Sequence, residues 1–301
     1  MSQDNGNATV VTEPVDVAPP QAIAETAGEG RGKTPWARWE VVAFLILVLT
    51  ALAMRFWDMG SQALHHDESL HATYSWYLYQ GRGYIHNPLM HGPFQFFGTA
   101  GVFWLLWDSD ATVRVLPALF GTALVAAPML LRRYLGRNGA LVTSVLLAFS
   151  PTMLYFSRFA RNDIIMAVWA VLLVTFMWRY MDTRKAWYLV LTAGVLALSF
   201  STKETTYILV VILGGYLLVR SAKDVFPWIV GRKRLRDFSP AGELLVLMGT
   251  LSLPLGSAGI ALFQGPLGLT LANTDPATAP SGIPIGSGLY VAFGTVLTLV
   301  I

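Results

Sequence analysis

The sequence contains no cysteine, and few of its residues are charged. Of the 301 residues, 13% are Asp, Glu, Lys or Arg, whereas 54% are hydrophobic. The lack of cysteine excludes disulfide bonds and thiolate metal sites, and it leaves the redox compartment open. The formal net charge of +3 is no argument for binding to nucleic acid. A chain of this length with so few charges is typical of a membrane protein rather than a soluble domain.

Long apolar runs recur along the chain and predict membrane-spanning helices. A helix needs roughly 20 mostly apolar residues to cross the ~30 Å hydrocarbon layer, and it satisfies its own backbone hydrogen bonds there. We therefore predict an all-α fold, a polytopic membrane helical bundle. The predicted spans are residues 39–57, 111–131, 139–156, 164–181, 186–202, 205–219, 243–264 and 287–301.

The distribution of positive charge predicts the orientation of these spans, because cytoplasmic loops collect Lys and Arg. The basic clusters all fall on one side only if residues 94–107 do not cross the membrane. This segment is short and aromatic, so we expect a juxtamembrane helix lying in the interface. The N-terminus is then cytoplasmic, and the chain is a multi-pass protein of the cell membrane. The clusters are Arg31/Lys33/Arg38, Arg132/Arg133/Arg137, Arg179/Arg184/Lys185 and the run 220–236.

Composition divides the chain into three regions. Residues 1–34 are rich in Ala, Pro, Glu, Thr and Gly, which predicts a disordered cytoplasmic tail. Residues 35–264 form the predicted transmembrane domain. Residues 265–301 combine a Gly/Pro/Thr-rich outer connector with a final helix that stops inside an apolar run, so we expect either a fragment or a shortened protein.

All five histidines fall in the predicted first outer loop, three of them in the stretch HHDESLH at residues 65–71. The five are His65, His66, His71, His86 and His91. Asp67 and Glu68 lie in the same stretch, at the start of a predicted amphipathic helix over 67–80. They are either a charged first turn, favourable at the positive end of the helix dipole, or a carboxylate held ready to accept a proton, and both can hold together. The predicted apolar stripe of this helix is Leu70, Tyr74, Tyr77 and Leu78.

Two further outer motifs carry ionisable groups close to the hydrocarbon. Such groups normally form ion pairs or line an aqueous cavity. In SRFARND, Arg158, Arg161 and Asp163 either form a satisfied ion-pair cluster or leave a positive surplus for an anionic group such as a lipid-linked phosphate. In STKET, Lys203 either extends to the headgroups or binds phosphate.

Histidine and carboxylate side chains together also suggest a metal. Neutral imidazole and carboxylate are good ligands for zinc or manganese, so a divalent metal is a candidate cofactor. The spacing matches no tight zinc signature, and the alternative is that the histidines contact a substrate or headgroups or are structural. The candidate ligands are Asp67, Asp163, His66 and His91.

Five stretches follow one another in the first two thirds of the chain: HHDESLHATYSWYL, GRGYIHNPLMHGPFQF, WDSDATVRVLPALFG, LRRYLGRNGALVTSVLLAFSPTMLYFSRFARND and LSFSTKETTYI. Together they resemble the GT-C superfamily of membrane glycosyltransferases. Within it the sequence is most similar to the protein mannosyltransferase and aminoarabinose transferase branch, especially the prokaryotic flippase-activity-associated proteins of archaeal-type N-glycosylation. The resemblance implies a GT-C-like bundle with juxtamembrane helices in the first outer loop.

The resemblance also implies an activity and its residues. The activity is transfer of a sugar from a polyprenyl-phosphate carrier to a protein, lipid or glycan acceptor on the outer face, within membrane lipids. Asp67 corresponds to the catalytic carboxylate with Glu68 beside it, and Asp163 to the acid that ends the second outer loop. Such a transfer needs a base for the acceptor hydroxyl and cations for the departing phosphate. The expected substrate-binding residues are His66, His71, His91, Arg158, Arg161 and Lys203.

Two other classes of function compete with transfer. A non-enzymatic flippase or presentation protein for lipid-linked sugars needs the cations but gains nothing from the Asp67 carboxylate. It also tolerates the absence of the further spans or large C-terminal domain that superfamily members usually have. A purely structural membrane subunit predicts no cluster of titratable groups on one face.

Overall fold

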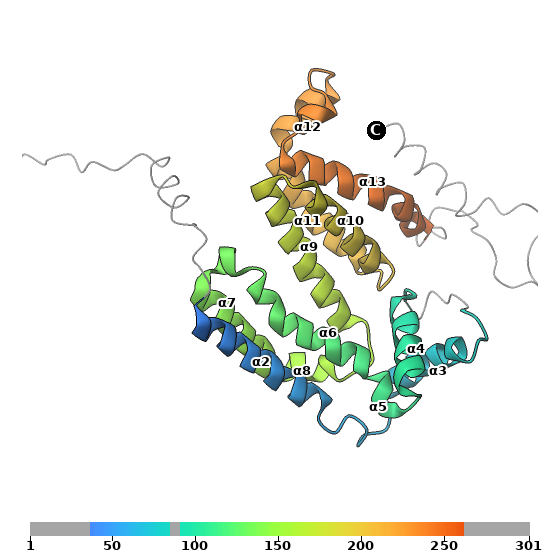
Figure 1. Ribbon diagram of the computed structural model, residues 1–301. Coiled ribbons are helices and arrows are strands. Elements are labelled where there is room, and N and C mark those ends of the chain that lie inside the picture. Colours follow the sequence, from blue (N-terminus) through green and yellow to red (C-terminus); the bar gives the residue numbers. More distant parts are fainter. Residues whose placement is uncertain (1–36, 85–90, 262–301) are drawn as a thin grey trace, which may run out of the picture. The chain divides into compact units, whose positions relative to one another are not determined.

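The computed structural model describes residues 37–84 and 91–261, with side chains as far as residue 252. Every regular element in these ranges is helical, which confirms the predicted all-α fold (Figure 1). The predicted tail over 1–34, His86, the connector at 265–286 and the final helix at 287–301 lie outside the described residues.

The helices follow the predicted order closely. Each of the first seven predicted spans overlaps at least one helix, and the predicted helices over 67–80 and 94–107 are present as α3 and α4. The α-helices are α2 (Arg38–Phe56), α3 (His66–Tyr79), α4 (Phe94–Leu106), α5 (Asp110–Val113), α6 (Val115–Ala126), α7 (Arg132–Phe149), α8 (Pro151–Ser157), α9 (Asp163–Thr183), α10 (Ala186–Phe200), α11 (Thr206–Arg220), α12 (Ala222–Ile229) and α13 (Pro240–Ala261), and the 3-10 helices are η2 (Ala127–Met129) and η3 (Leu235–Asp237).

Helix length limits how many of these segments can cross a bilayer alone. By length and composition, α2, α9 and the continuous segment Asp110–Met129 qualify within the described residues. A fourth span results if α7 and α8 count as one, although they meet at 63°. Pro151 opens α8 and cannot donate the hydrogen bond that would continue α7, which explains this bend. The apolar helices α4, α10 and α11 are shorter, so the eight crossings and their orientation stay predictions.

The largest apolar core is built around α9. Its buried residues on α9 include Ile165, Leu173 and Met177, and they pack with residues of α10, α11 and α13. In the first half of α9 three aromatic rings meet edge to face, with centroids 5.2–5.7 Å apart, and join α4 and α6 to α9. These rings are Phe94, Phe120 and Trp169. The core therefore sits directly behind the segment that carries SRFARND.

Helices α3 and α4 pack against each other (Figure 1), with aromatic contacts of His71 and Tyr74 to Phe96 and of Tyr79 to Phe103. The buried residues of α3 are Glu68, His71 and Ser75. The predicted apolar stripe is a different face of the helix, on which Leu70 is 36% exposed, and its position along the membrane stays a prediction. Hydrogen bonding decides the face, because the Glu68 carboxylate finds its donors on the buried side.

The chain leading into α4 runs beside the loop between α10 and α11. The Gly92 amide donates to the Thr202 carbonyl at 3.2 Å, and the Phe94 amide donates to the Ser201 carbonyl at 2.9 Å. A Cβ on Gly92 would lie 2.1 Å from the Ser201 carbonyl oxygen. Only glycine allows this approach, which brings the segment after residue 90 to the STKET motif.

Substitution of this glycine tests the contact. Gly92→Ala places a methyl group against backbone, so we expect a loss of about 1–3 kcal/mol in the free energy of unfolding. Gly101→Ala in α4 is the matched control, because nothing lies within 4 Å of its Cβ. Alanine is the better helix former by up to about 1 kcal/mol, so this control should be neutral or stabilising. Thermal unfolding in detergent measures both, and equal midpoints would contradict the close approach.

Candidate active site

Four charged side chains from three distant stretches form one chain of ion pairs. Arg161 lies 3.3 Å from the Asp67 carboxylate and 3.6 Å from that of Asp163. Lys203 binds the other oxygen of Asp163 at 2.5 Å. These residues come from the first turn of α3, the loop before α9, the first residue of α9 and the loop between α10 and α11. The structure therefore brings together the three motifs predicted to lie on one face.

The charges in this cluster balance. Asp67 and Asp163 carry two negative charges, and Arg161 and Lys203 carry two positive charges. Because Asp67 joins the cluster and Arg158 lies elsewhere, the predicted positive surplus is absent from it. Three of the side chains remain accessible, at 42% exposed for Asp67 and 34% for Arg161 and Asp163, so a ligand can compete for them, whereas Lys203 is only 14% exposed.

Glu68, the neighbour of Asp67, is saturated with hydrogen bonds. Its two oxygens accept from Nε and Nη2 of Arg114 at 2.8 Å each. They also accept from the backbone amides of Ala160 and His65 at 3.0 Å. Burial alone raises the pKa of the Glu68 carboxyl, but the donors, led by Arg114, outweigh it and leave the pKa lowered. With 1% exposure, this carboxylate is a structural anchor.

Arg114 completes the anchor from the other side. Its Nη1 donates to the carbonyls of Met59 and Gln62 at 2.7 and 3.0 Å, and its Nη2 donates to that of Ala63 at 3.2 Å. One guanidinium therefore holds the chain between α2 and α3. Two of its nitrogens, Nε and Nη2, bind the two oxygens of Glu68, which makes a bidentate charged pair.

His65 fixes the first turn of α3. Its Nδ1 accepts from the Asp67 amide at 3.3 Å, while its own amide donates to Glu68, which makes a capping box. Both acids lie in the first turn, as predicted, where the helix dipole favours negative charge. The cap turns the Glu68 carboxylate inward and leaves the Asp67 carboxylate toward Arg161.

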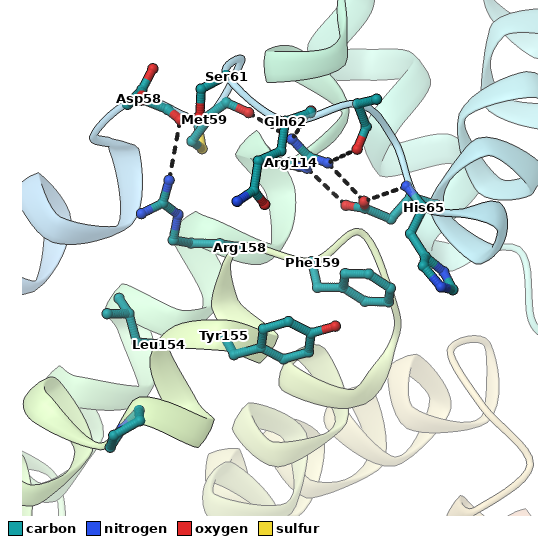
Figure 2. Close-up of a pocket in the computed structure, with 13 residues that line it drawn as sticks. Asp58, Met59, Ser61, Gln62, His65, Arg114, Leu154, Tyr155, Arg158 and Phe159 are labelled. Carbon is teal, nitrogen blue, oxygen red and sulfur yellow. Dashed lines mark hydrogen bonds and ion pairs between the residues drawn. The ribbon is translucent and has the colours of Figure 1, made fainter.

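A cavity of ≈ 540 Å³ lies on the other side of the anchor, between the 58–65 segment and α8 (Figure 2). The Tyr155 and Phe159 rings stack in its wall, with centroids 5.4 Å apart, and the His65 ring lies 5.5 Å from Phe159. Arg158 lines the cavity and donates from Nη2 to the carbonyls of Trp57 and Asp58 at 2.7 and 3.2 Å. Its guanidinium has no carboxylate partner in the described part of the chain.

The three predicted substrate-binding histidines have different surroundings. His66 is exposed on α3. The Nδ1 atom of His91 lies 2.7 Å from the Glu204 carboxylate, which joins the segment before α4 to STKET. His71 is buried and tilted against Phe96, and its Nδ1 has no hydrogen-bond partner among the described residues. Burial, followed by the positive charges of His91 and Arg161, lowers the pKa of His71 to about 4.

The predicted metal ligands do not converge. Within residues 37–84 and 91–261, no group of three or more His, Asp or Glu side chains is arranged to hold a metal ion. The Arg161 guanidinium lies between Asp67 and Asp163, His91 pairs with Glu204, and His66 stands apart. A cation placed between the two carboxylates would meet a positive charge, so the residues described do not fit a metal.

Three polar residues of the site were missed in the sequence. Arg114 is the most important of them. It could have been found as a single arginine at the start of an apolar span, because an ionised side chain in that position needs a partner. Gln95 of α4 donates to the Ala160 carbonyl at 2.8 Å and fixes the SRFARND loop. Asn162 is 1% exposed beside Arg161 and Asp163.

Comparison with known protein families identifies a match. The model of a family described as dolichyl-phosphate-mannose-protein mannosyltransferase matches residues 90–241, just over half of the 301 residues. The matched segment contains Arg158, Arg161, Asp163 and Lys203, whereas Asp67 precedes it. No curated protein matches the chain.

Breaking the buried anchor should destabilise the protein strongly. Arg114→Met leaves the Glu68 carboxylate buried without its cation, which costs about 3–5 kcal/mol of unfolding free energy. Arg133→Met is the control, because Arg133 forms a half-exposed pair with Asp182 at 3.6 Å and should lose at most about 1 kcal/mol. Denaturation of both variants in the same detergent measures the difference. An Arg114→Met variant as stable as the control would contradict the anchoring role.

The buried His71 predicts a pH dependence of stability. Its folded pKa of about 4 lies below the ordinary value of 6.5, so only the unfolded chain gains a proton at this position as the pH falls between them. The contribution of His71 to the free energy of unfolding is therefore complete above pH 6.5. It declines by about 3 kcal/mol in total as the pH falls toward 4. His71→Gln should flatten the slope of unfolding free energy against pH in this window. Parallel curves for variant and wild type would exclude His71 as the titrating group.

Proposed function

The chain belongs to the dolichyl-phosphate-mannose-protein mannosyltransferase family, which comprises membrane glycosyltransferases with polyprenyl-phosphate sugar donors, and we propose that it has this type of activity. In this proposal the protein transfers the sugar to an acceptor on the outer face of the membrane, and Asp67 is the base. Within the superfamily we place it beside the prokaryotic flippase-activity-associated proteins. The motifs from HHDESLH to STKET support this placement.

The contrast between two adjacent carboxylates carries the proposal. Four donors occupy the oxygens of Glu68, so Glu68 cannot also accept a proton from an acceptor hydroxyl. Asp67 is 42% exposed, and within the described ranges its carboxylate is held only by Arg161, at 3.3 Å. A general base needs a free lone pair within reach of the hydroxyl. Asp67 meets this requirement, and Glu68 fixes the backbone on which Asp67 stands.

The cations divide into two sets in this proposal. Arg158 lines the cavity beside His65, and no carboxylate in the described part of the chain neutralises it, so we assign it to the donor phosphate. Before the reaction, Arg161 is neutralised by Asp67 and Asp163. When Asp67 takes the acceptor proton, its negative charge disappears, so Asp67 no longer compensates the charge of Arg161 as the phosphate leaves. Stabilisation of the leaving group is thereby coupled to proton transfer.

The remaining predicted residues support this arrangement. Asp163 binds both Arg161 and Lys203, so we assign it the positioning of these cations. His66 and His91 lie at the accessible edge, where we assign them contacts with the substrates. His71 is 6% exposed, and we assign it the support of α3 against α4.

A flippase or presentation protein for lipid-linked sugars is the second candidate. It would use Arg158, Arg161 and Lys203 in the same way. Such a protein gains nothing from the exposed carboxylate of Asp67, which has Arg161 as its one partner among the residues that the structure describes, and this feature favours transfer.

Replacing the proposed base separates the two functions. Asp67→Asn keeps the shape of the side chain but removes its basicity, so turnover should fall about 10²- to 10⁴-fold with the fold retained. The measurement is sugar transfer from a panel of polyprenyl-phosphate sugars by purified protein, together with donor binding. Donor binding should persist in this variant.

Two further variants serve as controls. Asp182→Asn removes an acid near the other end of α9, hydrogen-bonded to Tyr134, and should transfer normally. Arg158→Gln should instead weaken donor binding. Near-normal turnover by Asp67→Asn would exclude it as the base. Donor binding by the wild type without transfer to any acceptor would favour presentation.

A further inference from the structure

Among the described residues, helix α12 (Ala222–Ile229) is fixed to its surroundings through the face that carries Asp224 and Trp228. The buried Asp224 carboxylate pairs with Lys233 at 2.5 Å and accepts hydrogen bonds from the amide and hydroxyl of Ser239. One turn later, the Trp228 ring meets Phe238 edge to face, with centroids 6.3 Å apart. The face that carries Asp224 and Trp228 is therefore fixed against the segment leading into α13.

The other face of α12 is apolar and uncovered. Phe226, Ile229 and Val230 are 77%, 69% and 62% exposed. Their spacing of three and four residues places them on one stripe of the helix. Two large side chains and a valine so exposed on an eight-residue helix are unusual for a surface that faces only water.

Basic residues flank this apolar stripe. Arg220 ends α11, Lys223 lies in the first turn of α12, and Arg232 and Arg234 follow it. None of these four side chains forms an ion pair with any residue in the ranges that the structure describes. The nearby acids are engaged, since Asp224 binds Lys233 and Asp237 pairs with Arg236 at 3.8 Å. The stripe therefore has four uncompensated positive charges at its ends.

We propose that α12 is an interfacial helix that inserts its apolar stripe among lipid chains and binds anionic lipid headgroups through Arg220, Lys223, Arg232 and Arg234. An amphipathic helix with exposed aromatic and aliphatic residues beside Lys and Arg lies in the plane of the membrane interface. Each basic residue near an anionic leaflet strengthens this attachment. The proposal does not depend on the reaction assigned to the site around Asp67.

The position of α12 in the chain supports a lipid partner. It follows α11, an apolar helix of 15 residues, after a break at Ser221. A helix of this length spans about 22 Å, less than the ~30 Å hydrocarbon layer. A short helix is accommodated by local thinning of the bilayer or by flanking residues that reach the interface. An interfacial α12 supplies such residues where α11 ends.

The absence of cysteine makes a direct test simple, because one introduced cysteine is unique. Ile229→Cys is labelled with an environment-sensitive fluorophore and reconstituted with brominated phosphatidylglycerol or brominated phosphatidylcholine. Asp237→Cys in η3, labelled in the same way, is the exposed control. We expect the label at 229 to be quenched by brominated lipid and protected from iodide, with the reverse at 237.

The role of the basic residues is tested in the labelled Ile229→Cys protein. Adding Arg232→Gln and Arg234→Gln should lower the preference of the site for phosphatidylglycerol over phosphatidylcholine roughly 10- to 30-fold at low salt. A label at 229 that iodide quenches as readily as at 237 would overturn the proposal. So would a label that neither quencher reaches, since protein would then cover the stripe. Lipid quenching without any preference between the two headgroups would overturn the anionic part.

Discussion

The buried pair between Glu68 and Arg114 is the interaction on which the candidate site depends. It joins the first turn of α3, the segment that follows α2, the start of α6 and the loop before α9, although the two residues lie 46 positions apart. Buried charges are tolerated only when opposite charge and hydrogen bonds compensate for lost water. Here both carboxylate oxygens of Glu68 accept hydrogen bonds, and most of the N–H groups of the Arg114 guanidinium donate them. These hydrogen bonds hold Glu68 in place and thereby position its neighbour Asp67.

Two consecutive acids thus have opposite roles that are set by helix geometry. Successive residues in a helix point in directions roughly 100° apart, so Glu68 faces the protein and Asp67 faces Arg161. The same first turn supplies both the anchor and the free carboxylate. On one side of it lies the balanced chain of four charges, and on the other lies the cavity with Tyr155, Phe159 and Arg158. His65 contributes to the first turn and to the cavity, because it caps the first turn of α3 and also lines the cavity.

Much of this architecture is predictable from apolar periodicity and charge. Most of the helices from α2 to α13 lie where the hydropathy predicts them, although α12 falls in a stretch that is predicted only as a basic cluster. The motifs HHDESLH, SRFARND and STKET meet, as their predicted position on one face of the membrane requires. The buried face of α3 is not predictable in this way, because hydropathy ranks Leu70 above Glu68 and takes no account of the donors on Arg114. The separation of Arg158 from Arg161 is also hidden in the sequence. It arises because Arg158 follows α8 after the bend at Pro151, whereas Arg161 precedes α9.

The balance of charge among Asp67, Arg161, Asp163 and Lys203 also bears on how a substrate reaches the site. Alternating charges a few ångströms apart cancel at a distance, and salt screens the remainder beyond about 8 Å. Such a cluster produces little long-range attraction, so it cannot draw an anion from solution by electrostatic steering. A donor held in the membrane needs no such attraction, because it arrives by lateral diffusion in two dimensions. The site is therefore suited to a ligand delivered along the bilayer, and its charges act only on contact.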